Sequence, residues 1–374
     1  MLKDTGPSVR IHGLASNLAA IGHQVRVVIP KDKSSEKLMD GVVVQSVRGI
    51  APRAVSRVFS KLLGVSRPTA LFFYDLLFVF RVGRIIHDYD LVQVEQQSAA
   101  ALFIPLVRIL KKPLVLDCHD VFQALRVRHT SAFRKILETF LEKVAYRNAD
   151  LIVTVSENEK QCLVSRGAEE DKVTVIPNGV NTEIFSRRER CGSGIALDGK
   201  RTVIFVGNME YLPNREAVHL IDAEIAPRVK KAVPNVRFLV VGRADNSIKS
   251  ENLVFAGVVN NVVDFLATSD VAIAPLLHGS GTRLKILEYF SCGLPVVSTT
   301  VGVEGLDVKS GVHALVEDNM DRFAIGVIKL LKDRELAIRL GKTARELVVN
   351  NYDWKEITMQ LSKAYRNLLL GIGN

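Results

Sequence analysis

One continuous stretch, residues 271–298, constrains the fold of this chain more than any other. It reads VAIAPLLHGSGTRLKILEYFSCGLPVVS: an apolar run, a glycine loop, a short amphipathic segment, a Gly-Leu-Pro turn and a second apolar run. Short apolar runs on both sides of a helical segment are typical of parallel strands joined by a helix. The predicted fold class is therefore α/β, and we expect the glycine loop to lie between a strand and the start of a helix.

The glycine loop of this stretch has the composition of a phosphate-binding site. Gly279 and Gly281 allow the backbone to approach a ligand closely, and the helix that follows directs its N–H groups and positive dipole end toward the loop. Arg283 and Lys285 add two cations to the first helical turn, where a helix alone is slightly destabilised by them, so an anionic ligand is expected. Glu288 can accept hydrogen bonds from sugar hydroxyls at the same place. The alternative is an ordinary β–α–β connection with solvated charged side chains.

The length and composition predict two globular domains. The 374 residues exceed one typical domain, and 48% hydrophobic residues are enough for two cores. No apolar run is long enough to span a bilayer, and the polar residues 1–7 predict no secretory signal. The cysteines form no C-x-x-C pair, which argues against a disulfide framework or a zinc site and fits a reducing compartment. They are Cys118, Cys162, Cys191 and Cys292.

The formal net charge of +10 predicts anionic partners. Nucleic acid is the weakest candidate, because the sequence contains no helix-turn-helix, zinc-finger or aromatic RNA-binding pattern. Residues 48–86 interleave arginines and lysines with leucines and phenylalanines, a pattern compatible with a helical region on an anionic membrane surface, although it fits a core helix at least as well. The alternative is a core helix whose arginines reach outward to solvent.

Polar residues follow two further predicted strands, where open parallel sheets bind their ligands. Residues 90–95 (DLVQVE) end in Glu95, and residues 113–120 (PLVLDCHD) contain His119 near their end. Histidine is a frequent acid–base group, although a histidine at a strand end often has only a structural role. His119 and Glu95 are therefore candidate site residues with both readings open.

Several segments occur in the order found in one enzyme family. They are GHQV at 22–25, VIPNGVN at 175–181, the glycine loop with its K-x-x-E, and CGLPVV at 292–297. Together they resemble the group-one glycosyltransferases, a large retaining family with the GT-B fold, and the GSGTRLKILE form of the loop resembles one subgroup. The resemblance implies two Rossmann-like, doubly wound domains that face a cleft, with acceptor on the N-terminal side and nucleotide-sugar on the C-terminal side.

The resemblance also implies domain boundaries. Residues 1–182 would form the acceptor-side domain, 183–200 the linker and 201–353 the nucleotide-sugar-binding domain, while helix 354–370 would pack back on the first domain. The central first strand that the family places before the first helix is missing. Either the start of the chain is assigned too late or the N-terminal domain is naturally shortened.

On the N-terminal side the resemblance implies acceptor-side and catalytic residues. Gly6 and Pro7, in a turn that enters the first helix, and Glu95 are the acceptor-side candidates. His119 stands in a D-x-H-D context, where the family often places a histidine near the reacting sugar, and it is therefore a catalytic candidate.

On the C-terminal side the chain departs from the usual family pattern. Many relatives carry an arginine and a lysine after a strand-ending glycine, but after Gly207 this chain has Asn208 and Asn214 at those positions. We therefore expect the positive charge at the donor diphosphate to come from the glycine loop. Glu288 matches the ribose-binding glutamate, but the family's other glutamate is replaced by Ser280. Ser280 and Glu288 join His119 as catalytic candidates. The expected donor-binding residues are Gly207, Asn208, Arg215, Gly279, Gly281, Thr282, Arg283 and Lys285.

The prediction from the resemblance is a retaining glycosyltransferase that moves a sugar from a UDP- or GDP-linked donor to a glycan or lipid-linked acceptor, in cell-surface polysaccharide or glycolipid synthesis. No cofactor other than the nucleotide-sugar co-substrate is expected, and no metal, because no acidic D-x-D pair lies in a suitable loop. The expected location is cytoplasmic, peripheral on the inner face of the membrane. The alternatives are a truncated, non-catalytic nucleotide-sugar-binding homologue and a GT-B sugar-nucleotide epimerase. A nicotinamide-dependent oxidoreductase is disfavoured, because no G-x-G-x-x-G follows a strand.

Overall fold

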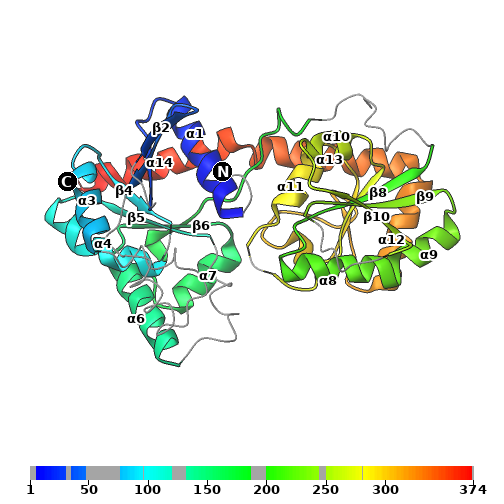
Figure 1. Ribbon diagram of the computed structural model, residues 1–374, viewed down its shortest axis with the longest axis horizontal. Coiled ribbons are helices and arrows are strands. Elements are labelled where there is room, and N and C mark those ends of the chain that lie inside the picture. Colours follow the sequence, from blue (N-terminus) through cyan, green and yellow to red (C-terminus); the bar gives the residue numbers. More distant parts are fainter. Residues whose placement is uncertain are drawn as a thin grey trace. The chain divides into compact units, whose positions relative to one another are not determined.

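The structure is a computed structural model that describes residues 6–30, 35–47, 76–95, 97–119, 132–186, 199–243, 250–279 and 281–372. The chain forms two compact units (Figure 1). The first unit contains Met1–Pro177 and Ile357–Asn374, and the second contains Asn178–Glu356. Each unit is an α/β fold with parallel strands, which confirms the predicted fold class.

The first unit begins with a helix and a small sheet. Helix α1 (Gly6–Ala20) is followed by strands β1 (Arg26–Pro30), β2 (Ser35–Met39) and β3 (Val42–Val47). The sheet order is β1-β3-β2, with β1 parallel and β2 antiparallel to β3. Gly6 and Pro7 lie in the first turn of α1 rather than in a turn before it. This placement is favourable because a proline in the first helical turn loses no hydrogen bond.

A second, four-stranded parallel sheet completes the first unit, in the order β4-β5-β6-β7. Its strands are β4 (Val92–Val94), β5 (Leu114–Cys118), β6 (Leu151–Thr154) and β7 (Val173–Val175). Besides α1, the described α-helices before and between these strands are α3 (Leu76–Ile86), α4 (Gln97–Ile109), α6 (Ala132–Asn148) and α7 (Glu157–Ser165). Every side chain of β5 and β6 is buried, as expected for continuous apolar runs in a parallel sheet covered on both faces.

The last helix, α14 (Trp354–Ile372), belongs to the first unit from Ile357 onward. It is tied to that unit by two side-chain hydrogen bonds. Ser362 Oγ lies 2.8 Å from His23 Nε2, and the Tyr365 hydroxyl donates to Gln93 Oε1 on β4. The segments that meet here lie far apart in the sequence, so α14 contributes side chains to the strand ends of the first unit.

The second unit is built on one six-stranded parallel sheet with the order β10-β9-β8-β11-β12-β13. Its strands are β8 (Arg201–Val206), β9 (Val236–Val241), β10 (Leu253–Gly257), β11 (Val271–Ala274), β12 (Val296–Ser298) and β13 (Leu315–Val316). The described α-helices are α8 (Leu212–Leu220), α9 (Ala226–Ala232), α10 (Val262–Ala267), α11 (Leu284–Ser291), α12 (Met320–Lys332) and α13 (Arg334–Asn351).

Helices cover both faces of this sheet, because alternate residues of each strand enter different cores. Val203 and Phe205 pack with residues of α8, α9 and α12, whereas Ile204 packs with residues of α10 and α11. Strand side chains point alternately to the two faces of a sheet, so this division is the expected one for a strand buried on both sides. The unit is therefore doubly wound.

The order of the strands defines a switch point in the second unit. From central β8 the chain adds β9 and β10 on one side, and then returns to add β11, β12 and β13 on the other. Strands β8 and β11 are hydrogen-bonded neighbours, so the winding direction changes between them. Doubly wound sheets bind ligands outside the carboxyl ends of the two strands at such a switch. Here β8 leads into Gly207, and β11 leads into the glycine loop.

Candidate active site

The cationic centre of the second unit is Lys285, in the first turn of α11. Its ammonium nitrogen lies 2.7 Å from Oδ1 of Asn214 and 4.2 Å from the centroid of the Phe205 ring. A neutral amide and an aromatic face both stabilise a cation without cancelling its charge. Lys285 is therefore fixed in position at the end of β8 while its charge stays available to an anion.

Asn214 can hold this lysine because its own amide is oriented from the other end. Its Nδ2 donates to the backbone oxygen of Asn208 at 2.9 Å, which directs Oδ1 toward the ammonium group. Gly207 provides the space for both groups. A Cβ at Gly207 would lie 2.9 Å from the Asn214 amide and 3.1 Å from Lys285 Nζ. A side chain there would displace the cradle, by which we mean Asn214 and Phe205 around the ammonium group of Lys285.

The environment of Lys285 weakens its hold on a proton. Burial, with the nearby Arg283 charge, lowers the pKa of Lys285 from 10.5 to about 7, against the opposing effect of Glu288. Burial raises the pKa of Glu288 to about 7, although Lys285 acts in the other direction. Groups whose pKa values are shifted this far by burial and a neighbouring charge are frequent at functional sites. Lys285 and Glu288 are two such groups, and they lie at the switch point.

Arg283 directly precedes α11, without a side-chain capping hydrogen bond, and is nearly buried, with 8% of its surface exposed. Its guanidinium group lies against the glycine loop, because a Cβ at Gly279 would stand 2.6 Å from one of its nitrogens. Gly279 has φ 149° and Gly281 has φ 70°, conformations that side chains rarely adopt. The glycines therefore serve the close packing of backbone on guanidinium, and Glu304 lies 4.0 Å from the same group.

The other predicted donor-side residues have structural partners in the second unit. The Thr282 hydroxyl accepts a hydrogen bond from Asn178 Nδ2 at 2.7 Å, and the side chain of Asn208 accepts one from the Glu210 amide at 3.0 Å. The amide of Arg215 donates to the oxygen of Tyr211 at 3.2 Å. Ser280 lies outside the described residues. Lys285 and Arg283 are therefore the predicted residues whose surroundings point most clearly to an anion.

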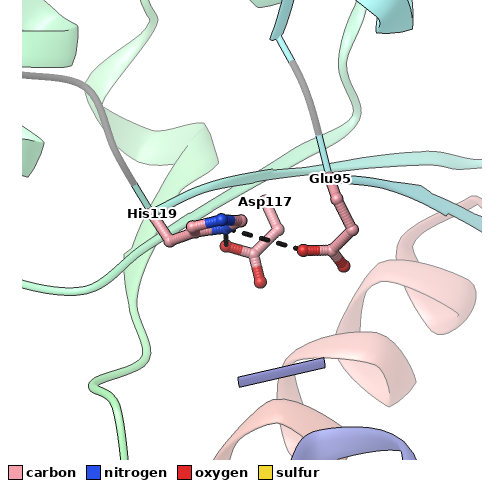
Figure 2. Close-up of side chains that lie close together, drawn as sticks. All are labelled: Glu95, Asp117 and His119. Atoms are coloured by element: carbon pink, nitrogen blue, oxygen red, sulfur yellow. Dashed lines mark ion pairs between the residues drawn. The ribbon is translucent and has the colours of Figure 1, made fainter. Parts of the chain in front are cut away.

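The first unit has a second cluster at the ends of β4 and β5. Glu95 follows β4, Asp117 is in β5 and His119 follows β5, and Figure 2 shows their side chains pointing toward one another. His119 Nδ1 lies 3.5 Å from a carboxylate oxygen of Glu95 and 3.5 Å from one of Asp117. The sequence predicted His119 and Glu95 as neighbours of a ligand, and the structure brings them together.

A buried arginine neutralises one of these carboxylates. Arg10, from α1, donates through Nε to both oxygens of Asp117, at 2.9 and 3.2 Å, and through another nitrogen to the backbone oxygen of Pro177 at 3.1 Å. Burial acts to raise the pKa of Asp117, but Arg10 and His119 together hold it below its usual value. At Glu95, burial and the Asp117 charge outweigh the opposing effects of His119, Gln93 and Arg10, and they raise its pKa to about 7.

Glu95, Asp117 and His119 also form a set of metal-ligating atoms that all lie within 4.8 Å of one another. A divalent ion there would share Asp117 with the Arg10 guanidinium, and the two cations would repel each other in a buried site. The Arg10 guanidinium on Asp117 therefore disfavours a metal ion at these atoms.

Four residues of the cluster were not predicted as site residues from the sequence: Arg10, Gln93, Asp117 and Tyr365. Asp117 stood in the D-x-H-D context and was the detectable one. Gln93 interrupts the otherwise apolar strand β4, which is a weak signal for a buried polar function. No local sequence pattern indicates Arg10 or Tyr365, because each lies far from the other cluster residues in the sequence and is brought to them only by folding.

Comparison with known proteins identifies the class of enzyme. Residues 5–184 match the family described as Glycosyltransferase Family 4, and residues 200–333 match Glycosyl transferases group 1. Both families are glycosyltransferases and their two matches together cover most of the chain, so the chain is a glycosyltransferase. It is a transferase enzyme, as predicted.

Relatives of this glycosyltransferase include enzymes with named substrates. It is 25% identical over 292 residues to the phosphatidyl-myo-inositol mannosyltransferase of Mycobacterium leprae, covering 75% of this chain and 74% of that protein. It is 26% identical over 285 residues to a UDP-Gal:alpha-D-GlcNAc-diphosphoundecaprenol alpha-1,3-galactosyltransferase of Escherichia coli, covering 71% and 72%.

Solved structures confirm the GT-B fold of the glycosyltransferase. Anabaena Alr3699/HepE in complex with UDP-glucose superposes with a TM-score of 0.71 at 16% identity, covering 98% of this chain and 97% of that one. Sucrose-phosphate synthase of Thermosynechococcus elongatus gives 0.71 at 19% identity, covering 98% and 94%. Within the described residues, none of the helices combines the length and apolar character needed to cross a bilayer.

Proposed function

We propose that this glycosyltransferase uses a UDP- or GDP-linked sugar as its donor and retains the anomeric configuration of that sugar. The observation that carries the proposal is the position of Lys285, held by Asn214 and Phe205 at the switch point of the second unit. A diphosphate is the anion that best fits a nearly buried pair of cations at a helix N-terminal end.

The cradle would act on the leaving group. When the bond between sugar and diphosphate breaks, negative charge grows on the departing phosphate, and preorganised cations and amides stabilise that charge most in a water-poor site. Lys285 and the N–H groups that open α11 are placed for this role, with Arg283 beside them. In the retaining mechanism implied by the family resemblance, the departing phosphate takes the proton of the acceptor hydroxyl.

The names of relatives support a nucleotide-sugar donor and suggest the acceptor. HepE was crystallised with UDP-glucose, the galactosyltransferase relative takes UDP-Gal and a diphosphoundecaprenol-linked sugar, and the mannosyltransferase relative acts on phosphatidyl-myo-inositol. We therefore propose a lipid-linked or glycan acceptor, used in cell-surface polysaccharide or glycolipid synthesis. On the acceptor side, Glu95 and His119 would contact the sugar hydroxyls.

We propose that the protein binds a membrane surface, and three helices of the first unit support this proposal. Of residues 48–86, predicted to lie on a membrane, only 76–86 are described. Helix α4 packs against α3, against α6 and against strands β4 and β5, so the exposed side of α4 faces away from the sheet. Neither α3 nor α4 contains an acidic residue. Exposed apolar and basic side chains on α3 and α6 include Phe80, Arg84, Ile136, Phe140, Lys143 and Arg147.

A donor screen tests the proposed reaction. The protein is incubated with UDP- and GDP-linked sugars and a polyprenyl diphosphate-sugar acceptor, and released nucleotide is measured alongside the anomeric configuration of the product. We expect release with one nucleotide class and an unchanged configuration. An inverted product would refute the retaining mode, and the absence of both binding and release with every donor would refute the proposed donor class.

Vesicle flotation tests the membrane surface. We expect binding to phosphatidylcholine vesicles only when they contain phosphatidylglycerol, with about a fivefold weaker partition for each of Lys143→Gln and Arg147→Gln. Phe140→Ser should also weaken binding. The matched control is Ile325→Ser on α12 of the second unit, since Ile325 and Phe140 are both 62% exposed. Equal losses for the two variants, or no flotation of the wild type, would contradict the assignment.

A further inference from the structure

We infer that Tyr365 and Gln93 are positioning residues for the first-unit cluster, through which the C-terminal helix fixes the orientation of Glu95 toward His119. Their role in a reaction rests on the proposed function, in which Glu95 and His119 contact the acceptor-side sugar. The orientation itself is a property of the first unit and can be measured without turnover.

Gln93 links the helix to both acids of the cluster. Its Nε2 donates to Glu95 Oε1 at 2.8 Å and reaches Asp117 Oδ2 at 3.5 Å, while its Oε1 accepts from the Tyr365 hydroxyl. An ionised carboxylate only accepts hydrogen bonds, so Asp117 and the ionised form of Glu95 require the NH₂ end of the amide. Only the oxygen end then remains for Tyr365, which must act as donor.

The surroundings keep Tyr365 in that donor role. The side chain is 8% exposed, and burial, reinforced by the charges of Asp117 and Glu95, keeps the pKa of Tyr365 well above its usual value. The hydroxyl therefore keeps its proton around neutral pH. On β4, Gln93 points to the opposite side from Val92 and Val94, because strand side chains alternate.

The hydrogen bond from Gln93 leaves one oxygen of Glu95 for His119. Glu95 Oε1 is held by Gln93, and Glu95 Oε2 is the atom 3.5 Å from His119 Nδ1. If the Tyr365 hydroxyl is removed, the Gln93 oxygen loses its donor among the described residues, and the amide can rotate so that its N–H no longer points at Glu95. Glu95 would then hold its proton more tightly, and the imidazolium form of His119 would lose its anionic neighbour.

Tyr365→Phe tests this inference by histidine NMR titration, with the His119 signal assigned from His119→Gln. We expect the His119 titration to move to lower pH by about half a unit or more. The acidic limb of the kcat–pH profile should move to higher pH, because Glu95 would hold its proton more tightly. The KM for the donor should stay within about twofold, since the donor cations belong to the other unit. An unshifted His119 titration in folded Tyr365→Phe would overturn the inference.

Ser362→Ala is the matched control, because it removes another hydroxyl from the same helix. Ser362 is bonded to His23 rather than to the cluster, so the variant should leave the His119 titration in place. A shift equal to that of Tyr365→Phe would show a general effect of helix packing and refute the inference that Tyr365 acts through Gln93. Gln93→Met should reproduce the Tyr365→Phe shift, and the double variant should add little to either, because the two residues act in series. Additive shifts would refute that series.

The NMR result and the activity result separate the two claims. If no nucleotide-sugar is used but the His119 titration shifts in Tyr365→Phe, the proposed function fails and the positioning stands. If the wild type transfers sugar but neither the titration nor the pH profile moves in Tyr365→Phe, the proposed function stands and the positioning fails.

Discussion

The two units place opposite charges at the ends of similar parallel strands, and they neutralise those charges differently. In the first unit, buried Asp117 is paired with buried Arg10 inside the protein. In the second unit, the ammonium group of Lys285 is held by an amide and an aromatic ring, neither of which carries a charge. The difference indicates that the first unit balances buried Asp117 by a direct ion pair. Lys285, although the charge of Glu288 acts on it, makes no direct ion pair within the described residues and is left to be balanced by a ligand.

Arg10→Met should produce the largest effect and should act on stability. It leaves Asp117 buried without its cation, a loss of about 3–5 kcal/mol in the free energy of unfolding, measurable by urea denaturation. Adding Asp117→Asn should recover much of the loss, because the uncompensated charge is then gone. A change below about 1 kcal/mol in Arg10→Met would show that the buried pair is not what balances the first unit.

Gly207→Ala should act on the donor and much less on stability. The new Cβ would meet Asn214 at 2.9 Å and Lys285 Nζ at 3.1 Å, displacing the cation from its cradle, and we expect kcat/KM for the donor to fall by about 10- to 100-fold. Gly311→Ala serves as control: Gly311 also lies in a loop of the second unit, and a Cβ there meets nothing within 4 Å, although its φ of 77° adds some backbone strain. Equal activity of Gly207→Ala and wild type would contradict the geometry of the cradle.

The contrast between the units also explains what the sequence could predict. The donor cradle was largely visible because the glycine loop, Arg283 and Lys285 are contiguous, and the helix that follows a glycine loop has a fixed direction. Its dependence on Asn214 was not visible, since a residue 71 positions away reaches Lys285 only through the order of the strands.

The first-unit cluster was predictable only in part, because its members come from widely separated segments. Strand ends pointed to Glu95 and His119, but Arg10 bonds Asp117 across 107 positions and Tyr365 bonds Gln93 across 272. Side-chain roles were also harder to predict than positions. Thr282 was predicted to bind the donor, and that stays a prediction; the hydrogen bond from Asn178 to its hydroxyl is a contact that no local pattern indicated.

Calorimetry of UDP and GDP binding to wild type and Lys285→Met tests the central claim most directly. Burial lowers the pKa of Lys285 to about 7, so a diphosphate that requires the ammonium form must bring a proton with it above that pH. At pH 7.5 and 8.5, where the diphosphate itself is ionised, wild type should take up a proton and bind up to about tenfold more weakly at the higher pH. Lys285→Met should bind about 10- to 1000-fold more weakly and take up no proton. Equal affinity and equal proton uptake in the two proteins would contradict the claim that Lys285 is the cation left for the donor.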